Sequence, residues 1–455
     1  MNDSLQAVWR RLTSTPAIVG FAGLAALLVL LAPIVLLSIL SRAEAERELT
    51  AKLADLEAAG FPLSGEALAS LYGGLPSDEN AAPVYQEAFL QIDIPREIAD
   101  ALPPWSAESW PEPGEPFPEE WSSLAEELIE KNAPGIELLH EAAAIPAARF
   151  PLDFSAGWAM LIPHVSELRA SARLLSFLVV WRAREGDWVE AVSDLETLFA
   201  VAGALDKEPT LISQLTRIAI LGIGLNALEQ ALTYSSPPAE FLGSLQELVE
   251  RQITDDSFLY PAMLGELAII VGYLSGIESD WELREDFGLS DMSGPPWRIW
   301  SYWYAGGLAR DKKLYLELTV HNIEAARASL PERLDLLVTD REIERMIAEY
   351  KLPSESLTAI LTPTVSKVFQ TEARVLSRAQ CAVIGMAAER YRFDYGHLPA
   401  DQDALVPEYL SELPMDPLTG DALDYLMEDS WLIISTRAVI PGREWSPRFR
   451  LPAER

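Results

Sequence analysis

The chain has 455 residues, of which 35 are Lys or Arg and 69 are Asp or Glu, so its formal net charge is −34. Hydrophobic residues make up 49%, which is enough for a sizeable core and too many for a chain disordered throughout. The charge argues against general nucleic-acid binding and against electrostatic docking on anionic lipid. The single cysteine, Cys381, excludes an internal disulfide and a cysteine-based zinc cluster.

The strongest local signal is the segment Ala17–Leu40, which holds 24 residues without a charge. About 20 apolar residues cross a bilayer as a helix. The run is longer than the apolar region of about 7–15 residues in a secretory signal peptide, and Ala43-Glu44-Ala45 is a poor cleavage site. The sequence therefore predicts an uncleaved signal anchor, in which Pro33 is tolerated.

The orientation of this anchor is weakly determined, because basic residues on its two sides are near parity. The next apolar segment, Ala262–Ile277, is short and interrupted by Glu266, so we interpret it as a buried globular helix. We therefore expect a single-pass protein of a bacterial inner membrane. Its residues 1–16 would form a cytoplasmic tail, and the bulk of the chain would be periplasmic.

An acidic, proline-rich region follows the anchor. Between Asp78 and Glu130 there are fourteen acidic residues and one basic residue, and six prolines fall between residues 103 and 118. Proline disfavours helix, so these residues predict an extended linker or an ordered loop. The region also contains four large aromatic residues, which indicate a loop that lies against the helical body: Trp105, Trp110, Phe117 and Trp121.

Two apolar stripes at helical spacing come next. The first runs through Leu168, Ala172, Leu175 and Val179, and the second through Trp188, Val192, Leu195, Phe199 and Ala202. Between them, Gly186 suits the end of one helix and Asp187 can cap the next. The segment resembles one tetratricopeptide-type hairpin. No clear second copy lies at a 34-residue period, so we expect a helical bundle or a short solenoid.

Trp297, Trp300 and Trp303 share one face of a further predicted helix and form a candidate interaction surface. Internal packing is the first interpretation, because aromatic side chains dominate core energetics. A position in the membrane interface is the second, since the protein is tethered to a bilayer. A platform for sugar rings is the third.

The C-terminal segment carries a recognisable order of elements. A long helix ends near Tyr391, Gly396 and Pro399, and an Asp416-Pro417 turn follows. Residues 425–427 and 431–435 then predict a hairpin of two short strands. This order resembles the C-terminal half of the major pseudopilin of type II secretion systems. The whole layout also resembles large membrane-anchored bacterial proteins, which implies an architecture and no particular activity.

The resemblance implies calcium, which major pseudopilins bind in their C-terminal loop. Asp416, Asp421 and Asp424 surround a glycine-containing turn and are the candidate ligands, because calcium prefers several carboxylate oxygens. The alternative is that Asp416 is a turn residue whose side chain caps local backbone. No other cofactor is expected.

Motifs for catalysis are not found in this sequence: it has no phosphate-binding glycine loop, no Gly-x-Ser-x-Gly and no His-Glu-x-x-His. We interpret the four histidines as structural, and Cys381 as a small buried hydrophobe. Glu282, Glu285 and Asp286 beside Trp281 could mimic a glycosidase pair, but nothing in the sequence fixes their separation.

Taken together, the sequence predicts a mainly α-helical protein in six parts. These are a cytoplasmic tail (1–16), a transmembrane helix (17–40), juxtamembrane helices (41–75), an acidic proline-rich linker or loop (76–120), a helical domain (121–363), and a long helix with a pseudopilin-like α+β module (364–455). The predicted function is an extracytoplasmic scaffold that binds envelope or secretion proteins, and no nucleic acid. The alternative is an envelope enzyme, such as a glycan hydrolase, that uses the aromatic cluster Trp297–Tyr304.

Overall fold

The structure is a computed structural model that describes residues 15–106, 109–112, 115–254, 256–276, 285, 295–353, 356–362, 365–438 and 447–454. It is mainly helical, with one small antiparallel sheet. The chain divides into two compact units, each built from three separate segments. Unit 1 comprises Met1–Phe61, Leu274–Leu318 and Thr339–Pro363, and unit 2 comprises Pro62–Tyr273, Thr319–Val338 and Thr364–Arg455. The predicted linear order of domains therefore differs from this division, in which distant segments pack together.

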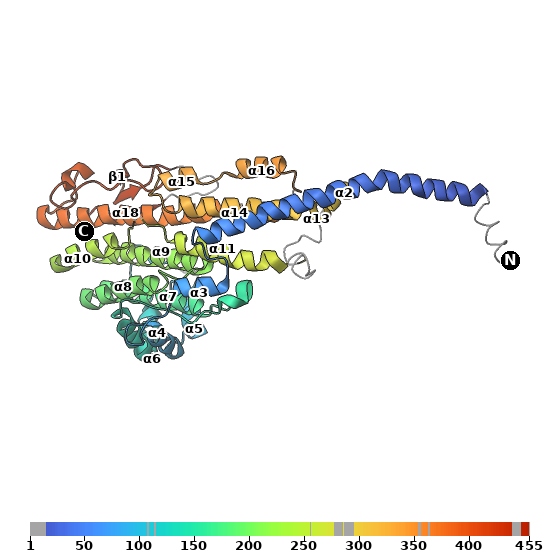
Figure 1. Ribbon diagram of the computed structural model, residues 1–455. Helices are drawn as coiled ribbons and strands as arrows, with labels where there is room; N and C mark the ends of the chain where they lie inside the picture. The colour runs from blue at the N-terminus through green and yellow to red at the C-terminus, as the bar shows by residue number, and fades with distance from the viewer. Residues whose placement is uncertain are drawn as a thin grey trace. The chain divides into compact units, whose positions relative to one another are not determined.

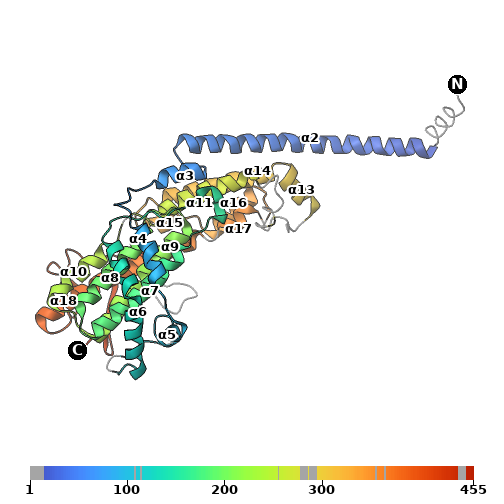
Figure 2. The same cartoon turned by 90° about the horizontal axis from the view of Figure 1, so that it is seen from below.

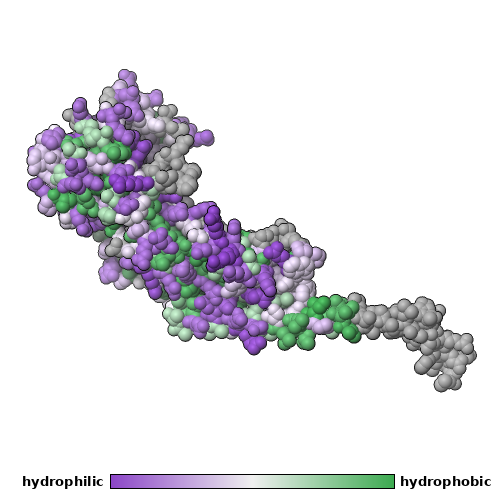
Figure 3. All heavy atoms as spheres, turned by 90° about the horizontal axis from the view of Figure 1, so that it is seen from above, coloured by the Kyte–Doolittle hydropathy of each residue, from purple (hydrophilic) through white to green (hydrophobic). Residues whose placement is uncertain are grey.

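Unit 1 is built on one long helix. Its elements are α2 (Thr15–Ala58), α13 (Pro296–Tyr304), the part of α14 (Gly307–Ala325) through Leu318, α16 (Asp340–Glu349) and α17 (Leu357–Leu361). As predicted, α2 continues through Pro33. From Val29 to Leu40 its large apolar side chains are between 44% and 73% exposed, and they form a green band in Figure 3. A contiguous apolar surface of this kind marks a membrane or a protein interface.

A second apolar helix, α9 (Leu211–Tyr234), belongs to unit 2. Within the part of the chain whose side chains the structure describes, which leaves out residues 15–28 of α2, α9 is long and apolar enough to cross a membrane by length and composition. Half of its apolar window is buried, and it packs against α7 (His164–Arg184), α8 (Trp188–Gly203) and α18 (Val365–Tyr395). These contacts are those of the core helix of a globular unit.

The two helices predicted on either side of Gly186 are confirmed as α7 and α8. Gly186 has φ +84°, and the Asp187 carboxylate accepts the N–H of Glu190 at 3.3 Å, so the turn forms for the expected reasons. All nine residues of the two apolar stripes are buried. Because α9 packs against both helices, this hairpin forms one layer of unit 2 (Figure 1).

The remaining helices of unit 2 surround this core. They are α3 (Gly65–Tyr72), α4 (Ala82–Gln91), α5 (Arg96–Ala101), α6 (Glu119–Ala143), η1 (Phe154–Ala159), α10 (Ala239–Glu250), α11 (Leu259–Gly276), α15 (Glu332–Leu336) and η4 (Gln402–Leu405). The expectation of a buried globular helix at Ala262–Ile277 is confirmed as far as Ile270, since α11 contributes buried apolar side chains to unit 2 from Leu259 to Ile270.

The acidic region is more ordered than a linker, since it contains α4 and α5. Of the six prolines between residues 103 and 118, those that the structure describes lie in the irregular stretch between α5 and α6. The predicted contact of its aromatic residues with the helical body is confirmed: the Trp110 ring lies 5.9 Å from that of Phe177 on α7 and 6.4 Å from that of Tyr234 on α9. The irregular stretch between α5 and α6 is therefore packed against the helices of unit 2, as its aromatic residues indicated and its prolines alone did not.

The C-terminal segment forms a three-stranded antiparallel sheet packed on α18. The predicted hairpin is confirmed as β1 (Asp424–Glu428) and β2 (Trp431–Ser435), and β3 (Arg448–Pro452) pairs with β2 as a strand that was not predicted. A Cβ at Gly385 of α18 would lie 2.7 Å from the Phe449 ring, so only glycine permits β3 to approach this closely.

Candidate functional site

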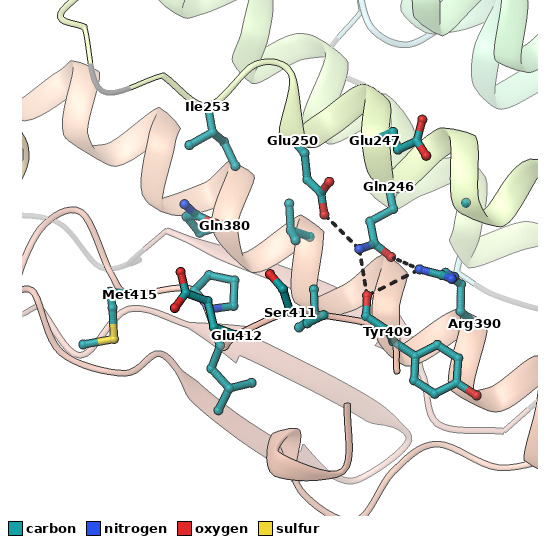
Figure 4. Close-up of a pocket in the computed structure, with 15 residues that line it drawn as sticks. Gln246, Glu247, Glu250, Ile253, Gln380, Arg390, Tyr409, Ser411, Glu412 and Met415 are labelled. Carbon is teal, nitrogen blue, oxygen red and sulfur yellow. Dashed lines mark hydrogen bonds between the residues drawn. The ribbon is translucent and has the colours of Figure 1, made fainter. Parts of the chain in front are cut away.

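A groove of about 710 Å³ lies in unit 2 between α10, α18 and residues 409–415 (Figure 4). We call it the α10 groove. At its floor, the Gln246 amide donates to Glu250 Oε1 at 2.8 Å and to the Tyr409 carbonyl at 3.0 Å. Arg390 Nη1 donates to Gln246 Oε1 at 2.9 Å. These polar groups bond to one another, so they stiffen the floor of the groove rather than stand ready for proton transfer.

A second groove, of about 770 Å³, lies at the C-terminal end of α18, and we call it the α18 groove. Its lining includes Phe393, which is 61% exposed, and Met427, which is 50% exposed. Glu389 and Arg392 form an ion pair in the same lining. Two large exposed apolar side chains at a concave surface are suited to receiving an apolar group from a partner.

The three candidate calcium ligands do not converge. The buried Asp416 carboxylate accepts the Leu418 N–H at 3.0 Å and the Thr436 hydroxyl, while Asp424 pairs with Arg437 at 2.6 Å and Asp421 is exposed. Across the residues that the structure describes, no three His, Cys, Asp or Glu side chains are grouped to hold a metal. Asp416 acts as the turn residue of the alternative interpretation, and the residues present do not fit a calcium ion.

The tryptophan cluster lies on α13 but is not packed inside the unit. Trp297 is 69% exposed, and Trp300 and Trp303 are half-buried. The residue of this helix that fills the interior is Tyr302, at 2% exposure. Internal packing of the three tryptophans, the first interpretation of the sequence, is therefore wrong for Trp297. The reason is that α13 is aromatic on several faces, and Tyr302 takes the inner one.

Of the three carboxylates considered for a glycosidase pair, the structure describes Glu285. Trp281, Glu282 and Asp286 lie outside the described residues, and Glu285 is exposed. A hollow of about 520 Å³ in unit 1 is lined by Arg298, Asp340 and Glu344, among others, and none of the α13 tryptophans is in its lining. The alternative of an envelope glycan hydrolase is therefore not tested by the described residues and stays a hypothesis.

The histidines have structural partners, as predicted. His164 Nε2 lies 2.9 Å from Glu208 Oε1, and its ring stacks on Phe150 at 4.1 Å. His140 Nδ1 lies 2.8 Å from Thr197 Oγ1. His321 Nε2 lies 2.7 Å from the Leu336 carbonyl oxygen, and His397 Nδ1 lies 2.9 Å from the Leu398 carbonyl oxygen. Cys381 is fully buried, and burial raises the pKa of its thiol far above the ordinary value, so it is the inert hydrophobe that was expected.

One cluster has the residue types of a nucleophile, a base and an orienting carboxylate. Ser193 Oγ lies 3.3 Å from His140 Nδ1, and His140 Nε2 lies 3.2 Å from Asp194. Thr197 Oγ1 is closer to the same Nδ1, at 2.8 Å, and Arg182 holds Asp194 at 2.9 Å. The cluster joins α6, α7 and α8 and lines neither groove, so it acts as a structural network.

The groove residues Gln246, Arg390, Phe393 and Met427 were not predicted from the sequence. The signal that points to the α18 groove is Phe393, an aromatic residue in the last turn of a helix whose apolar stripe ends before it. Phe393 is a candidate contact residue because its side chain is exposed, and that exposure depends on long-range packing that cannot be read from the sequence.

Comparison of the chain with protein-family models, with curated proteins and with solved structures gave no match.

Proposed function

We propose that this chain is a single-pass protein of a bacterial inner membrane that presents a helical scaffold on the extracytoplasmic side. Helix α2 would be the anchor, since the uncharged run Ala17–Leu40 is long enough to cross a bilayer and its apolar side chains from Val29 to Leu40 are exposed. Units 1 and 2 would then carry the protein-binding surfaces.

The α18 groove is the observation that carries the scaffold role. It combines exposed Phe393 and Met427 with the acidic side chains of Asp429 and Glu454 in its lining. The chain segment 398–430, which contributes to this lining, holds nine acidic residues and no Lys or Arg. Apolar anchors in a concave site supply most of an interface's affinity, and complementary charge supplies orientation and association rate. The proposed partner is therefore an envelope or secretion protein that inserts an apolar side chain from a basic surface.

Photo-crosslinking from the full chain in its membrane tests this proposal. A photoreactive residue in place of Phe393 should give one dominant adduct with a basic envelope protein. Its yield should fall severalfold in 0.5 M salt, because charged surfaces are screened at that ionic strength. Met427→Asp should lower the same yield severalfold by placing a charge in the groove.

The matched control is the same photoreactive residue in place of Leu90, which is 85% exposed on α4 and outside both grooves. The proposal predicts that this position gives none of the salt-sensitive adduct. Equal adducts from the two positions, or none from position 393, would show that the groove is not a docking site.

A further inference from the structure

The aromatic face of α13 is exposed and regular. Trp297, Trp300 and Tyr304 follow one another at spacings of three and four, which places them on one side of the helix. Trp297 and Tyr304 are 69% and 60% exposed, and the ring centroids of Trp300 and Tyr304 are 6.3 Å apart. Unit 1 thus presents a stripe of amphipathic rings to its surroundings.

Buried hydrogen bonds on the opposite side fix this orientation. The Tyr302 hydroxyl donates to Asp311 Oδ2 at 2.6 Å, and the fully buried Asp311 also accepts the N–H groups of Leu357 and Thr358 at the start of α17. Arg298 Nη2 donates to the Leu352 carbonyl at 2.8 Å. The exposure of the stripe is therefore built into the packing of unit 1.

The turn between α13 and α14, at Ala305 and Gly306, which we call the elbow, contacts α2 just after its apolar run ends at Leu40. Ser41, the residue after Leu40, donates from its Oγ to the Ala305 carbonyl at 3.0 Å. Gly306, with φ +81°, approaches so closely that a Cβ would lie 2.9 Å from Cα of Arg42. Helix α13 lies beside α2 in both ribbon views (Figures 1 and 2). The elbow thus lies about 1.5 Å along the helix axis from the last apolar residue.

We propose that α13 lies in the headgroup region of the bilayer and forms a second membrane contact beside the anchor. Trp and Tyr rings favour the membrane–water interface, because one part of each is apolar and another forms hydrogen bonds. Residues 296–304 contain no Asp or Glu in a chain of net charge −34, so this helix adds no repulsion from lipid phosphates. The contact is made by aromatic burial rather than by charge. It rests on the proposed function, since it requires α2 to span the membrane.

Depth-dependent quenching in the full-length protein tests this inference. Cys381 is fully buried, so an introduced surface cysteine is the site that an environment-sensitive fluorophore labels. Tyr304→Cys, Leu36→Cys and Arg345→Cys would each be labelled in phosphatidylcholine vesicles that contain lipids with a spin label at a shallow or a deep position. Arg345 is the control in the same unit, with a side chain 68% exposed on α16.

We expect shallow spin labels to quench the label at position 304 at least twofold more than the label at 345, and deep ones to quench the label at 36. Trp297→Gln should lower the quenching at 304 about twofold, since it removes a neighbouring interfacial ring. Quenching at 36 together with equal signals at 304 and 345 would overturn the α13 contact and leave the anchor intact. A label at 36 that is not quenched would overturn the anchor and this inference together.

Discussion

Replacing Arg333 with Met is expected to lower the free energy of unfolding of unit 2 by about 3–5 kcal/mol, the range for removing one member of a buried ion pair. The side chains of Arg333 and Glu372 are both 0% exposed, and Arg333 Nη1 lies 2.9 Å from Glu372 Oε2. Glu372 would keep the N–H of Phe258 and the hydroxyl of Ser257 as donors, but it would lose the positive charge of Arg333 that compensates its own buried negative charge. Pulse proteolysis of the solubilised full chain across a urea series measures this change.

The effect of Arg333→Met should also grow with pH. Burial raises the pKa of Glu372 above its ordinary value of 4.5, although Arg333 opposes the shift. Without Arg333 the folded state holds the Glu372 proton more tightly than the unfolded state does, so stability falls as pH rises above 4.5. Adding Glu372→Gln should therefore restore part of the loss at pH 7.

The control for this prediction is Arg96→Met, also in unit 2. Arg96 pairs with Asp100 at 3.5 Å on the surface, with side chains 91% and 72% exposed, so its removal should change stability by less than about 0.5 kcal/mol. If Arg333→Met proved as mild as Arg96→Met, the buried pair would not hold α15 to α18 as the structure indicates.

Gly265→Ala is expected to destabilise unit 2 by about 3 kcal/mol or more, at the upper end of the range for overpacking. A Cβ at Gly265 of α11 would lie 1.7 Å from the carbonyl oxygen of Pro209, which is backbone and cannot rotate away. The clash would push α11 from the start of α9, where Thr210 caps the helix by accepting the N–H of Ser213 at 3.1 Å. The same urea series measures the loss.

Gly272→Ala in the same helix provides the matched control. No atom lies within 4 Å of the Cβ that would be added there, and alanine is the better helix former. This variant should be neutral or more stable by about 0.5–1 kcal/mol. Equal behaviour of the two alanine variants would mean that α11 does not approach Pro209 as closely as described.

The hairpin of α7 and α8 was predictable because all of its signals are local. The apolar spacing, Gly186 and Asp187 lie within about 40 residues and act on their own neighbours. The division into two units was not predictable, since it depends on contacts between segments that are far apart in the chain. Strand β3 was also missed, although Phe449 and Leu451 alternate with arginines as a half-buried strand does.

The candidate sites show a similar limit. The sequence identified the α13 aromatic residues but not which of them faces inward, because helical periodicity gives no direction when several faces carry rings. For Asp416, the hydroxyl of Thr436 comes from twenty residues further along the chain, so no local pattern shows that the carboxylate already has partners. The grooves arise wholly from long-range packing.

Labelling of variants with one introduced surface cysteine, in bacterial spheroplasts with a membrane-impermeant maleimide, tests the central claim most directly. Leu90→Cys in unit 2 and Arg345→Cys in unit 1 are exposed positions, and the natural chain is the blank because Cys381 is buried. We expect both variants to fractionate with membranes after carbonate washing and to be labelled in intact spheroplasts. Labelling only after the membrane is permeabilised, or release of the chain by carbonate, would contradict an anchored extracytoplasmic scaffold.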